Sequence, residues 1–249
     1  MDPVKYGWGL PPDISTHGAA IDNLIIVLHI FMIALFTGWG IYLLYCLIRF
    51  RQRAGSTANY ESAKSKFPKY LEIGVVLFEA FLLIGLSFPV WSKLKTDFPK
   101  SADSTEVRIV AQQFACNIHY PGRDGKFGPT RPELVSNDNP VGVDRKSPAG
   151  RDDIISVNQF HFPVNKPVIV HLSSLDVIHS FAIPVLRIKQ DAIPGMNIPV
   201  WFEATKTGQF DIQCAQLCGL GHSRMRGFVT VATEEQFAAW LQEQESYLD

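Results

Sequence analysis

The chain has 249 residues, of which 47% are hydrophobic and 19% charged, and its formal net charge is -1 at pH 7. Basic and acidic residues nearly cancel, which excludes the strongly basic surface typical of nucleic-acid binding. The hydrophobic content also excludes a disordered chain. Hydrophobic residues concentrate in two stretches before Val90, and the remaining residues have the composition of one globular domain.

The first apolar stretch runs from Leu24 to Ile48 without a formal charge. Its about 25 residues would make roughly 37 Å of helix, which exceeds the ~30 Å hydrocarbon core of a bilayer. A buried helix of a soluble protein is rarely apolar on all sides for this length, so we predict a transmembrane span. A cleaved signal peptide is the alternative, but it would have a shorter apolar region after a basic N-terminus. The preceding residues are instead acidic, with Asp2, Asp13 and Asp22 against Lys5.

A second apolar stretch lies between Tyr70 and Trp91, two aromatic residues suited to a membrane–water boundary. The segment between the two spans is basic and contains one acid, Glu61, beside Arg49, Arg51, Arg53, Lys64, Lys66 and Lys69. The positive-inside rule places this segment in the cytoplasm. The sequence therefore predicts a two-pass protein of a bacterial inner membrane, with both termini and all residues after Trp91 on the periplasmic side.

Two glutamates interrupt the second span. Glu72 and Glu79 are seven residues apart, and at ~100° per residue they lie on the same helix face. Because a carboxylate facing lipid is costly, this face is expected to contact protein or a hydrated path. Glu72 could instead reach water at the membrane boundary, and Glu79 could be protonated and hydrogen-bonded to a partner helix. Both are candidates for a proton path.

After the spans, short runs rich in Val, Ile and Phe are separated by Pro, Gly, Asn and Asp, which predicts an all-β sandwich or barrel. The expected strands are 106–120, 153–158, 167–174, 178–184, 197–204, 208–214 and 227–232. A Pro-Gly turn is expected at 192–195. Residues 121–152 are rich in Gly, Pro and charges, and we interpret them as a long loop of the kind that often contacts partners.

The last residues differ from the rest of the domain. Thr233 and Gln236 make a capping box, and Phe237, Trp240 and Leu241 follow with helical spacing, which predicts a short C-terminal helix. The predicted organisation is an N-terminal segment at 1–22, a helical hairpin with its cytoplasmic loop at 23–91, a linker at 92–104, a sandwich domain at 105–232 and a C-terminal helix at 233–249.

Soft metal-binding side chains cluster near the end of the domain. Cys214, Cys218, His222 and Met225 lie within twelve residues, and His179 stands upstream at a strand start. Thiolate, thioether and imidazole donors together favour copper. A mononuclear blue-copper site would use one cysteine, whereas two thiolates on one loop can bridge two copper ions. A Cys214–Cys218 disulfide would leave His222 and Met225 without a role, and a zinc site would leave Met225 unused.

The metal-loop pattern Cys-x-x-x-Cys-Gly-x-x-His-x-x-Met at 214–225 occurs with an Asp-Val-x-His-Ser-Phe strand at 176–181. Together with the segments 158–163 and 189–195 and the helical hairpin, these motifs resemble subunit II of cytochrome c oxidase over nearly the whole chain. The resemblance implies that residues 105–232 are a cupredoxin-like domain with a dinuclear copper centre, CuA. In the family's pattern Cys214 and Cys218 bridge two coppers. The remaining ligands are His179 and Met225 for one copper, and His222 and the Gln216 carbonyl for the other.

The resemblance also implies an enzyme subunit of a proton-pumping terminal oxidase. A c-type cytochrome would supply electrons at the copper centre, and these would continue to haem in subunit I, where oxygen is reduced to water. Subunits I and III and membrane lipid are then the expected partners. No haem is expected on this chain, which has no Cys-x-x-Cys-His motif. In the family's pattern Glu72 lies at the mouth of a proton path through subunit I, while Glu79 has no counterpart.

Two other functions remain as alternatives. The chain could be the small subunit of a CuA-containing nitric oxide reductase, or a stand-alone, membrane-anchored copper-binding protein. The two intramembrane glutamates argue against a stand-alone protein, because a mere anchor has no need of them.

The sequence departs from the family pattern at two places. Most members have glutamate where this chain has Gln216, and the loss of an anionic oxygen puts a magnesium ion at the subunit I contact in doubt. The aromatic residue at which electrons first reach the domain is usually tryptophan, and its position is taken here by Phe114. The loop 121–152, extended to Asp153, also balances six acids against six bases. We therefore expect a non-standard cytochrome donor, such as one held in a supercomplex.

Overall fold

A computed structural model describes residues 9–55, 57 and 65–245 of the chain. Glu61 and Lys64, used for the predicted orientation, and Asp2 and Lys5, used against a signal peptide, lie outside these residues. The chain divides into two compact units. One unit consists of the residues up to Ala19 together with Asp97–Asp249, and the other of Ala20–Thr96. In the sequence, the second unit is therefore inserted into the first.

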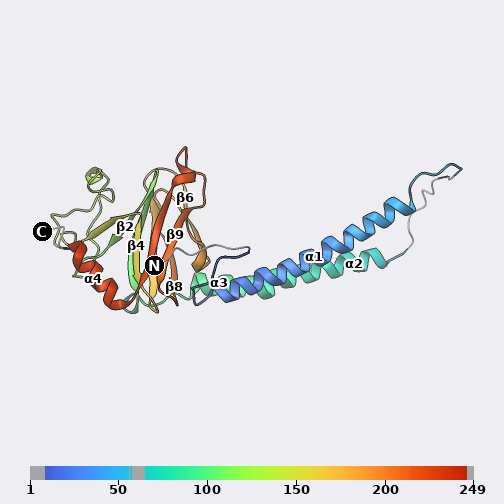
Figure 1. Cartoon of the computed structure of the whole chain (residues 1–249), viewed down its shortest axis with the longest axis horizontal. Coiled ribbons are helices and arrows are strands. Elements are labelled where there is room, and N and C mark those ends of the chain that lie inside the picture. The colour runs from blue at the N-terminus through green and yellow to red at the C-terminus, as the bar shows by residue number, and fades with distance from the viewer. Residues whose placement is uncertain (1–8, 56, 58–64, 246–249) are drawn as a thin grey trace. The chain divides into compact units, whose positions relative to one another are not determined.

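The inserted unit is helical. Helix α1 covers Gly18–Arg49, and a second helical run consists of α2 (Phe67–Phe81), the π-helix η1 (Leu82–Ser87) and α3 (Phe88–Thr96). By length and composition, both runs are long and apolar enough to cross a membrane. The rings of Phe31 and Phe78 meet at 4.8 Å and pack α1 against α2. The predicted spans thus fall inside two observed helices (Figure 1).

The second helical run is longer than predicted. It continues beyond Trp91 to Thr96, into residues that we expected to be a linker. The hydroxyl of Thr96 donates a hydrogen bond to the Ser92 carbonyl at 2.8 Å. Lys93 and Lys95 lie in the last turn, where a positive charge interacts favourably with the helix dipole.

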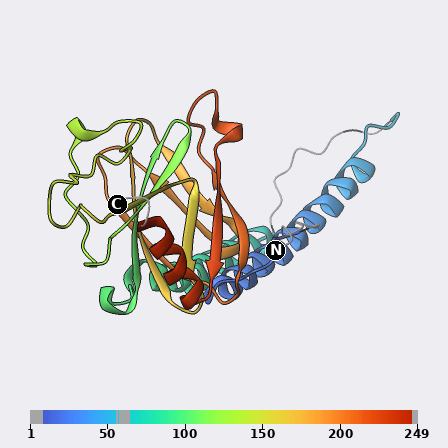
Figure 2. The same ribbon diagram turned by 60° about the vertical axis from the view of Figure 1, so that its left-hand side comes forward.

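In the described part of the chain, ten strands form two five-stranded sheets (Figures 1 and 2). The first sheet has the order β3-β2-β1-β5-β8 and comprises β1 (Thr105–Gln112), β2 (Ala115–Tyr120), β3 (Ile154–Val157), β5 (Pro167–Ser174) and β8 (Ile198–Glu203). The second has the order β4-β10-β9-β6-β7 and comprises β4 (Gln159–Pro163), β6 (His179–Ile183), β7 (Ile188–Ala192), β9 (Gly208–Cys214) and β10 (Arg226–Ala232). Short 3₁₀ turns lie at Ser101–Asp103, Pro132–Leu134, Pro184–Leu186 and His222–Arg224.

The core lies between the two sheets. Along β1, Val107, Ile109 and Ala111 are buried while the residues between them are partly exposed, which is the period-two pattern of a strand with one face inward. Phe162 of the second sheet packs edge-on against Phe202 of the first, with ring centroids 5.3 Å apart. Each fully buried side chain of this size contributes roughly 1.5–3 kcal/mol of hydrophobic stabilisation. The sandwich therefore holds its strand ends in fixed positions.

Several predicted features are confirmed. The loop at 193–196 is a Pro-Gly turn, because Gly195 has φ +74° and the Met196 N–H donates to the Ile193 carbonyl at 3.2 Å. Helix α4 (Glu234–Glu245) begins with the expected capping box. The Thr233 N–H donates to the Gln236 side chain, and the Gln236 N–H donates to the Thr233 hydroxyl. Helix α4 packs along the outside of the sandwich (Figure 2).

Other features were not predicted. The run 106–120 is a hairpin of two strands that turns at Gln113 and Phe114, and β4 and β7 were not expected as separate strands. Residues Asp13–Thr16, here called the N-terminal seam, join the sandwich before α1 begins. Within the seam, the Ile14 N–H donates to the Val185 carbonyl, and the Ile14 carbonyl accepts from the Thr205 N–H.

Candidate metal centre

The candidate metal centre lies on the loop that connects β9 to β10. Cys214 is the last residue of β9, and Met225 immediately precedes β10. The two are joined by a hydrogen bond from the Cys214 N–H to the Met225 carbonyl at 3.3 Å. Within the loop, the short 3₁₀ turn at His222–Arg224 is followed by a bond from the Met225 N–H to the His222 carbonyl. The loop is thus a closed hairpin whose side chains converge.

The possible donor atoms form one continuous cluster. The Sγ atoms of Cys214 and Cys218 are 3.8 Å apart. On one side, the Cys214 sulfur is 3.8 Å from His179 Nδ1 and 3.2 Å from the Gln216 carbonyl oxygen. On the other side, the Cys218 sulfur is 3.7 Å from His222 Nδ1 and 3.7 Å from the Met225 sulfur. All six predicted metal-binding residues are therefore brought together.

His179 comes from a different strand. It begins β6, which pairs with β9 so that Phe181 lies opposite Cys214. The Ala215 N–H also donates to the Ser180 carbonyl at 2.9 Å, which fixes the loop against β6. His179 is 1% exposed, so its ring can reach only the inner side of the loop.

The carboxylate of Asp176 orients the His179 ring. Its Oδ1 is 2.9 Å from His179 Nε2. A proton on Nε2 donated to Asp176 leaves Nδ1, the nitrogen near Cys214, free to bind a metal. Burial raises the pKa of Asp176, but hydrogen bonds from the Gln113 N–H, the His179 ring and the Val177 N–H outweigh it, so the pKa is lowered overall. Asp176 therefore remains ionised beside the imidazole.

Gln113 connects the β1–β2 turn to the metal loop. Its backbone N–H donates to Asp176 Oδ2 at 2.7 Å, and its side-chain Nε2 donates to the Cys218 carbonyl at 2.6 Å. Figures 1 and 2 show the β1–β2 turn and the β9–β10 loop at the same end of the sandwich. This role of Gln113 was not predicted from the sequence.

Phe114 lies against the metal loop. A Cβ added at Gly221 would be 2.5 Å from the Phe114 ring, so only glycine leaves room for the ring at this position. The Phe114 side chain is 40% exposed and forms part of the surface beside the loop. Behind the centre, buried Cys116 borders a small cavity with His179 and Cys214. Burial raises the pKa of the Cys116 thiol to about 12, so this thiol is neutral.

The two loop cysteines are free thiols rather than a disulfide. Their separation of 3.8 Å is well beyond the ~2.05 Å of a sulfur–sulfur bond. Burial and the neighbouring Cys214 raise the pKa of the Cys218 thiol to about 11. A disulfide, one of the alternatives left by the sequence, is therefore not the state of this loop.

The donor set fits copper. His179, Cys214 and Cys218 have ligand atoms within 4.8 Å of one another. A sulfur–sulfur distance of 3.8 Å is less than twice a metal–thiolate bond of ~2.3 Å, so both sulfurs can bind the same ion. Met225 is 5% exposed and its sulfur contacts the cluster, which a zinc site would not require. Thiolate, thioether and imidazole donors are the set that copper prefers.

The other predicted candidates lie elsewhere. Glu72 and Glu79 are on α2 in the helical unit, and both side chains are exposed. Gln216 has an exposed side chain, while its carbonyl oxygen points toward the cysteines. Several other histidines have contacts away from the metal loop. These are His29 with the Ile25 carbonyl, His119 with Asp153, His161 with Trp240 and His171 with Glu106.

Comparison with known proteins agrees with this geometry. The sequence model of the family described as "Cytochrome C oxidase subunit II, periplasmic domain" matches residues 145–232, which contain all six candidate ligands. An "Alternative cytochrome c oxidase subunit 2" of Bradyrhizobium diazoefficiens is 37% identical over 242 residues, covering 96% of this chain and 85% of that relative. The chain belongs to the cytochrome c oxidase subunit II family.

Two other members of the family are less similar in sequence. The cytochrome c oxidase subunit 2 of Cereibacter sphaeroides is 30% identical over 259 residues, covering 97% of this chain and 81% of that protein. The crystal structure of the periplasmic domain of subunit II (CoxB) of Bradyrhizobium japonicum is 32% identical, with a TM-score of 0.45, and covers 61% of this chain and 99% of that one. This subunit II is thus a membrane-anchored part of an oxidoreductase complex, and its two helices and cupredoxin-like domain confirm the predicted fold.

Proposed function

We propose that this subunit II accepts electrons one at a time at a dinuclear copper centre and passes them to haem in subunit I. The observation that supports this most strongly is a pair of free thiols 3.8 Å apart, ringed by two imidazole nitrogens, a thioether and a carbonyl oxygen. One thiol suffices for a mononuclear blue-copper site. Two copper ions bridged by thiolates require a second thiol close to the first, and the second loop cysteine meets this requirement.

The ligand roles follow the family's pattern. Cys214 and Cys218 would bridge the two coppers, His179 and Met225 would complete one, and His222 and the Gln216 carbonyl the other. When bound, the coppers supply a one-electron redox couple. Gln216 would bind copper through its backbone only, and its neutral side chain offers no anionic oxygen to a magnesium ion.

The chain's own contribution is to hold these donors still. The loop ends are joined by backbone hydrogen bonds, Gln113 is bonded to the Cys218 carbonyl, and Asp176 fixes the His179 ring. The rigid sandwich beneath prevents the ligands from moving when charge is added or removed. Because the ligands move little, less energy is needed to reorganise the site during electron transfer.

On the donor side, we propose that a c-type cytochrome docks near Phe114. The neighbouring loop residues Leu217 and Leu220 are also exposed, so the surface beside the copper ligands is apolar. The acids and bases of the long loop balance, and Arg131 forms an ion pair with Asp144 at 3.5 Å. A donor held in a supercomplex suits such a surface, because it does not need long-range charge steering. Fast turnover with soluble cytochrome c that falls steeply with added salt would contradict this proposal.

The membrane part completes the proposal. The copper domain would face the periplasm of a bacterial inner membrane, with subunits I and III packed against the two helices. Oxygen would be reduced to water on subunit I, coupled to proton pumping, and Glu72 would open a proton path. The segments before the first span and after the second would lie on the same side of the membrane. This is supported by the fold, because the N-terminal seam and the residues after Asp97 belong to one compact unit.

The experiment that tests the copper centre is electron paramagnetic resonance of the copper-loaded full chain. We expect hyperfine splitting from one electron shared equally by two copper nuclei. Cys218→Ser should reduce this to splitting from a single nucleus, because one bridge is lost. A single-nucleus spectrum in the unmodified chain would contradict the dinuclear centre.

A second measurement separates the oxidase from the alternatives. Complexes purified through this chain should contain subunit I haem and should consume oxygen. Consumption of nitric oxide without oxygen would instead indicate the small subunit of a nitric oxide reductase. A chain that purifies alone with bound copper would indicate a stand-alone copper-binding protein.

A further inference from the structure

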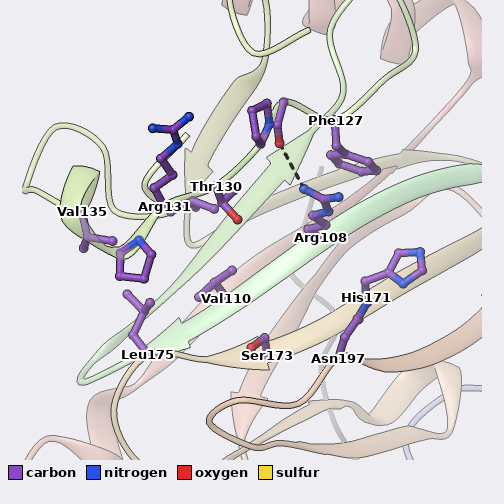
Figure 3. Close-up of a pocket in the computed structure, with 14 residues that line it drawn as sticks. Arg108, Val110, Phe127, Thr130, Arg131, Val135, His171, Ser173, Leu175 and Asn197 are labelled. Atoms are coloured by element: carbon purple, nitrogen blue, oxygen red, sulfur yellow. Dashed lines mark hydrogen bonds between the residues drawn. The ribbon is translucent and has the colours of Figure 1, made fainter. Parts of the chain in front are cut away.

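A cleft of about 610 Å³ lies on the outer face of the first sheet, away from the metal loop's ligands (Figure 3). Its floor is formed by Arg108 and Val110 of β1 and by His171 and Ser173 of β5, which lie opposite each other in the strand register. Its wall is the first part of the long loop, Phe127–Pro132 with Val135. This volume is within the ~300–1,000 Å³ range of small-molecule sites.

Buried polar contacts hold the wall of the cleft in place. His119 Nε2 and Asp153 Oδ2 are 2.6 Å apart, and both side chains are fully buried. The same carboxylate oxygen accepts a hydrogen bond from the Gly128 N–H at 2.8 Å. Arg145 donates to the Asp153 backbone carbonyl at 3.1 Å. The part of the loop that borders the cleft is therefore anchored to the sheet rather than free.

Arg108 is a half-buried cation that faces this cleft. Its guanidinium lies 4.2 Å from the centroid of the Phe127 ring, and its one hydrogen bond within the described part of the chain, to the Gly128 carbonyl, is long at 3.4 Å. Burial lowers the pKa of Arg108, although the charges of Asp153 and Glu106 partly oppose this. A guanidinium carries five N–H donors. Most of the donors of Arg108 are thus available to a ligand.

The carboxylates nearest to Arg108 have other partners. Among the described residues, Glu106 is paired with His171 at 3.7 Å and Asp153 with His119. The described ion pairs of the chain include none that contains Arg108. Asp153 and Glu106 therefore act on Arg108 from beyond ion-pair distance, and a bound anion would give its guanidinium a direct partner.

The two ends of the cleft differ in polarity. Figure 3 shows Val110, Val135 and Leu175 toward one end, with Arg131 beside Val135 at its rim, and Arg108 and His171 toward the other. Val135 and Leu175 are 38% and 42% exposed. An anion held by Arg108 would therefore extend its remaining part over an apolar surface.

We propose that this cleft binds a small organic carboxylate with a short apolar tail. The carboxylate accepts hydrogen bonds from the guanidinium of Arg108, which suits a planar, bidentate contact. The tail covers the apolar end of the cleft and excludes water from it. The volume fits a compact ligand, and the guanidinium of Arg108 fits a single carboxylate.

Binding of hexanoate to the full chain tests this proposal, with saturation-transfer NMR as the readout. We expect a dissociation constant of roughly millimolar, as suits so small a ligand. Hexylammonium and hexan-1-ol, which match its length but not its charge, should bind at least about tenfold more weakly. Arg108→Gln should weaken hexanoate binding by about tenfold or more.

Arg226→Gln is the matched control, because Arg226 also lies over a phenylalanine ring, that of Phe228 at 5.0 Å, but outside the cleft. It should leave hexanoate binding unchanged. Ser173→Phe provides a second test that keeps Arg108 and fills the floor of the cleft, and it should also abolish binding. Equal binding of hexanoate by Arg108→Gln, or equal binding of hexan-1-ol, would overturn the proposal.

The remaining outcome is that the cleft is occupied by protein rather than by a small ligand. If hexanoate does not bind the full chain at all, the small-ligand proposal is wrong. A Thr130→Cys variant then shows whether the cleft is covered by protein. Protection of this thiol from labelling only in the assembled oxidase would indicate an acidic segment of a partner subunit.

Discussion

At the scale of single residues, the metal centre depends on side chains that are not ligands. Asp176 binds the His179 ring and the Gln113 backbone, and Gln113 binds the Cys218 carbonyl. One hydrogen-bonded chain thus links the two ligand-bearing segments. Outer partners of this kind fix the tautomer and direction of a ligating histidine.

Replacing Asp176 with asparagine should therefore weaken copper binding without removing a ligand. We expect the affinity to fall roughly 10–100-fold, as for other outer partners of metal-binding histidines. Competition with a copper chelator measures this directly. Asp211→Asn is the control, because Asp211 forms an ion pair with Arg226 at the surface of the neighbouring strands. Equal affinities of the two variants would show that Asp176 has no orienting role.

The six candidate ligands could be predicted because five of them lie on one loop and the sixth lies in a recognisable motif. Residue types and spacing indicate His179, Cys214, Cys218, His222 and Met225, whereas the Gln216 carbonyl follows from the family resemblance alone. The roles of Asp176 and Gln113 could not be predicted in the same way. Gln113 is 63 positions from Asp176 and 105 from Cys218, so their contacts exist only once β1, β6 and β9 have assembled.

At the scale of elements, the strands that the sequence did not reveal are the edges of the second sheet. β4 and β7 each have one neighbouring strand in that sheet. β7 contains Lys189, Gln190 and Asp191, whose side chains are depleted in strands. Polar residues at an edge reduce unwanted pairing, and they also remove the hydrophobic pattern by which strands are predicted. The central strands β5 and β9 were predicted with their observed bounds.

Helix α4 is held on the sandwich by stacked rings. The Trp240 ring lies parallel to that of His161 at 4.1 Å and meets the Tyr120 ring at 5.2 Å. The Tyr120 hydroxyl donates to the His161 carbonyl and accepts from its N–H. The imidazole therefore serves as a flat packing surface.

This packing makes the stability of the domain depend on pH. Burial lowers the pKa of His161 to about 4, below its ordinary value of ~6.5. Between these values the unfolded chain binds more protons, so the free energy of unfolding falls as the pH falls. Allowing for the solvent exposure of the ring, we expect a loss of roughly 1–2 kcal/mol.

Urea unfolding of the full chain at pH 7 and pH 5 measures this dependence. His161→Phe keeps the stacked ring and the backbone hydrogen bonds but cannot take up a proton. It should lose less stability on acidification than the unmodified chain. His171→Phe, which removes a half-buried imidazole on β5, serves as the control. If both variants keep the full pH dependence, His161 is not its source.

At the scale of the whole molecule, the chain consists of a helical membrane unit and a sandwich unit. The fold class and the two spans followed from apolar length and strand pattern, which are local properties. The N-terminal seam did not follow, because its few residues carry no strand pattern and gain their structure from distant partners. It joins residues before the first span to residues after the second.

Exchange of Glu72 for glutamine tests the proposed proton path in the assembled oxidase. We expect turnover to fall by about tenfold, because an ionisable group is lost while its shape is kept. Copper content should not change. Glu79 lies about two turns further along the same helix. Glu79→Gln shows whether that residue belongs to the same path. Unchanged turnover and proton uptake in Glu72→Gln would contradict its assigned role.

The seam also constrains how the protein is made. Ile14 and Thr205 are bonded across 191 positions. At roughly 5–20 residues per second, about 10–40 seconds of translation separate their emergence from the ribosome. The seam residues must therefore wait for their partners until both apolar helices and most strands have been made. The metal loop emerges later still, so the proposed copper binding would be one of the last events in the subunit's biogenesis.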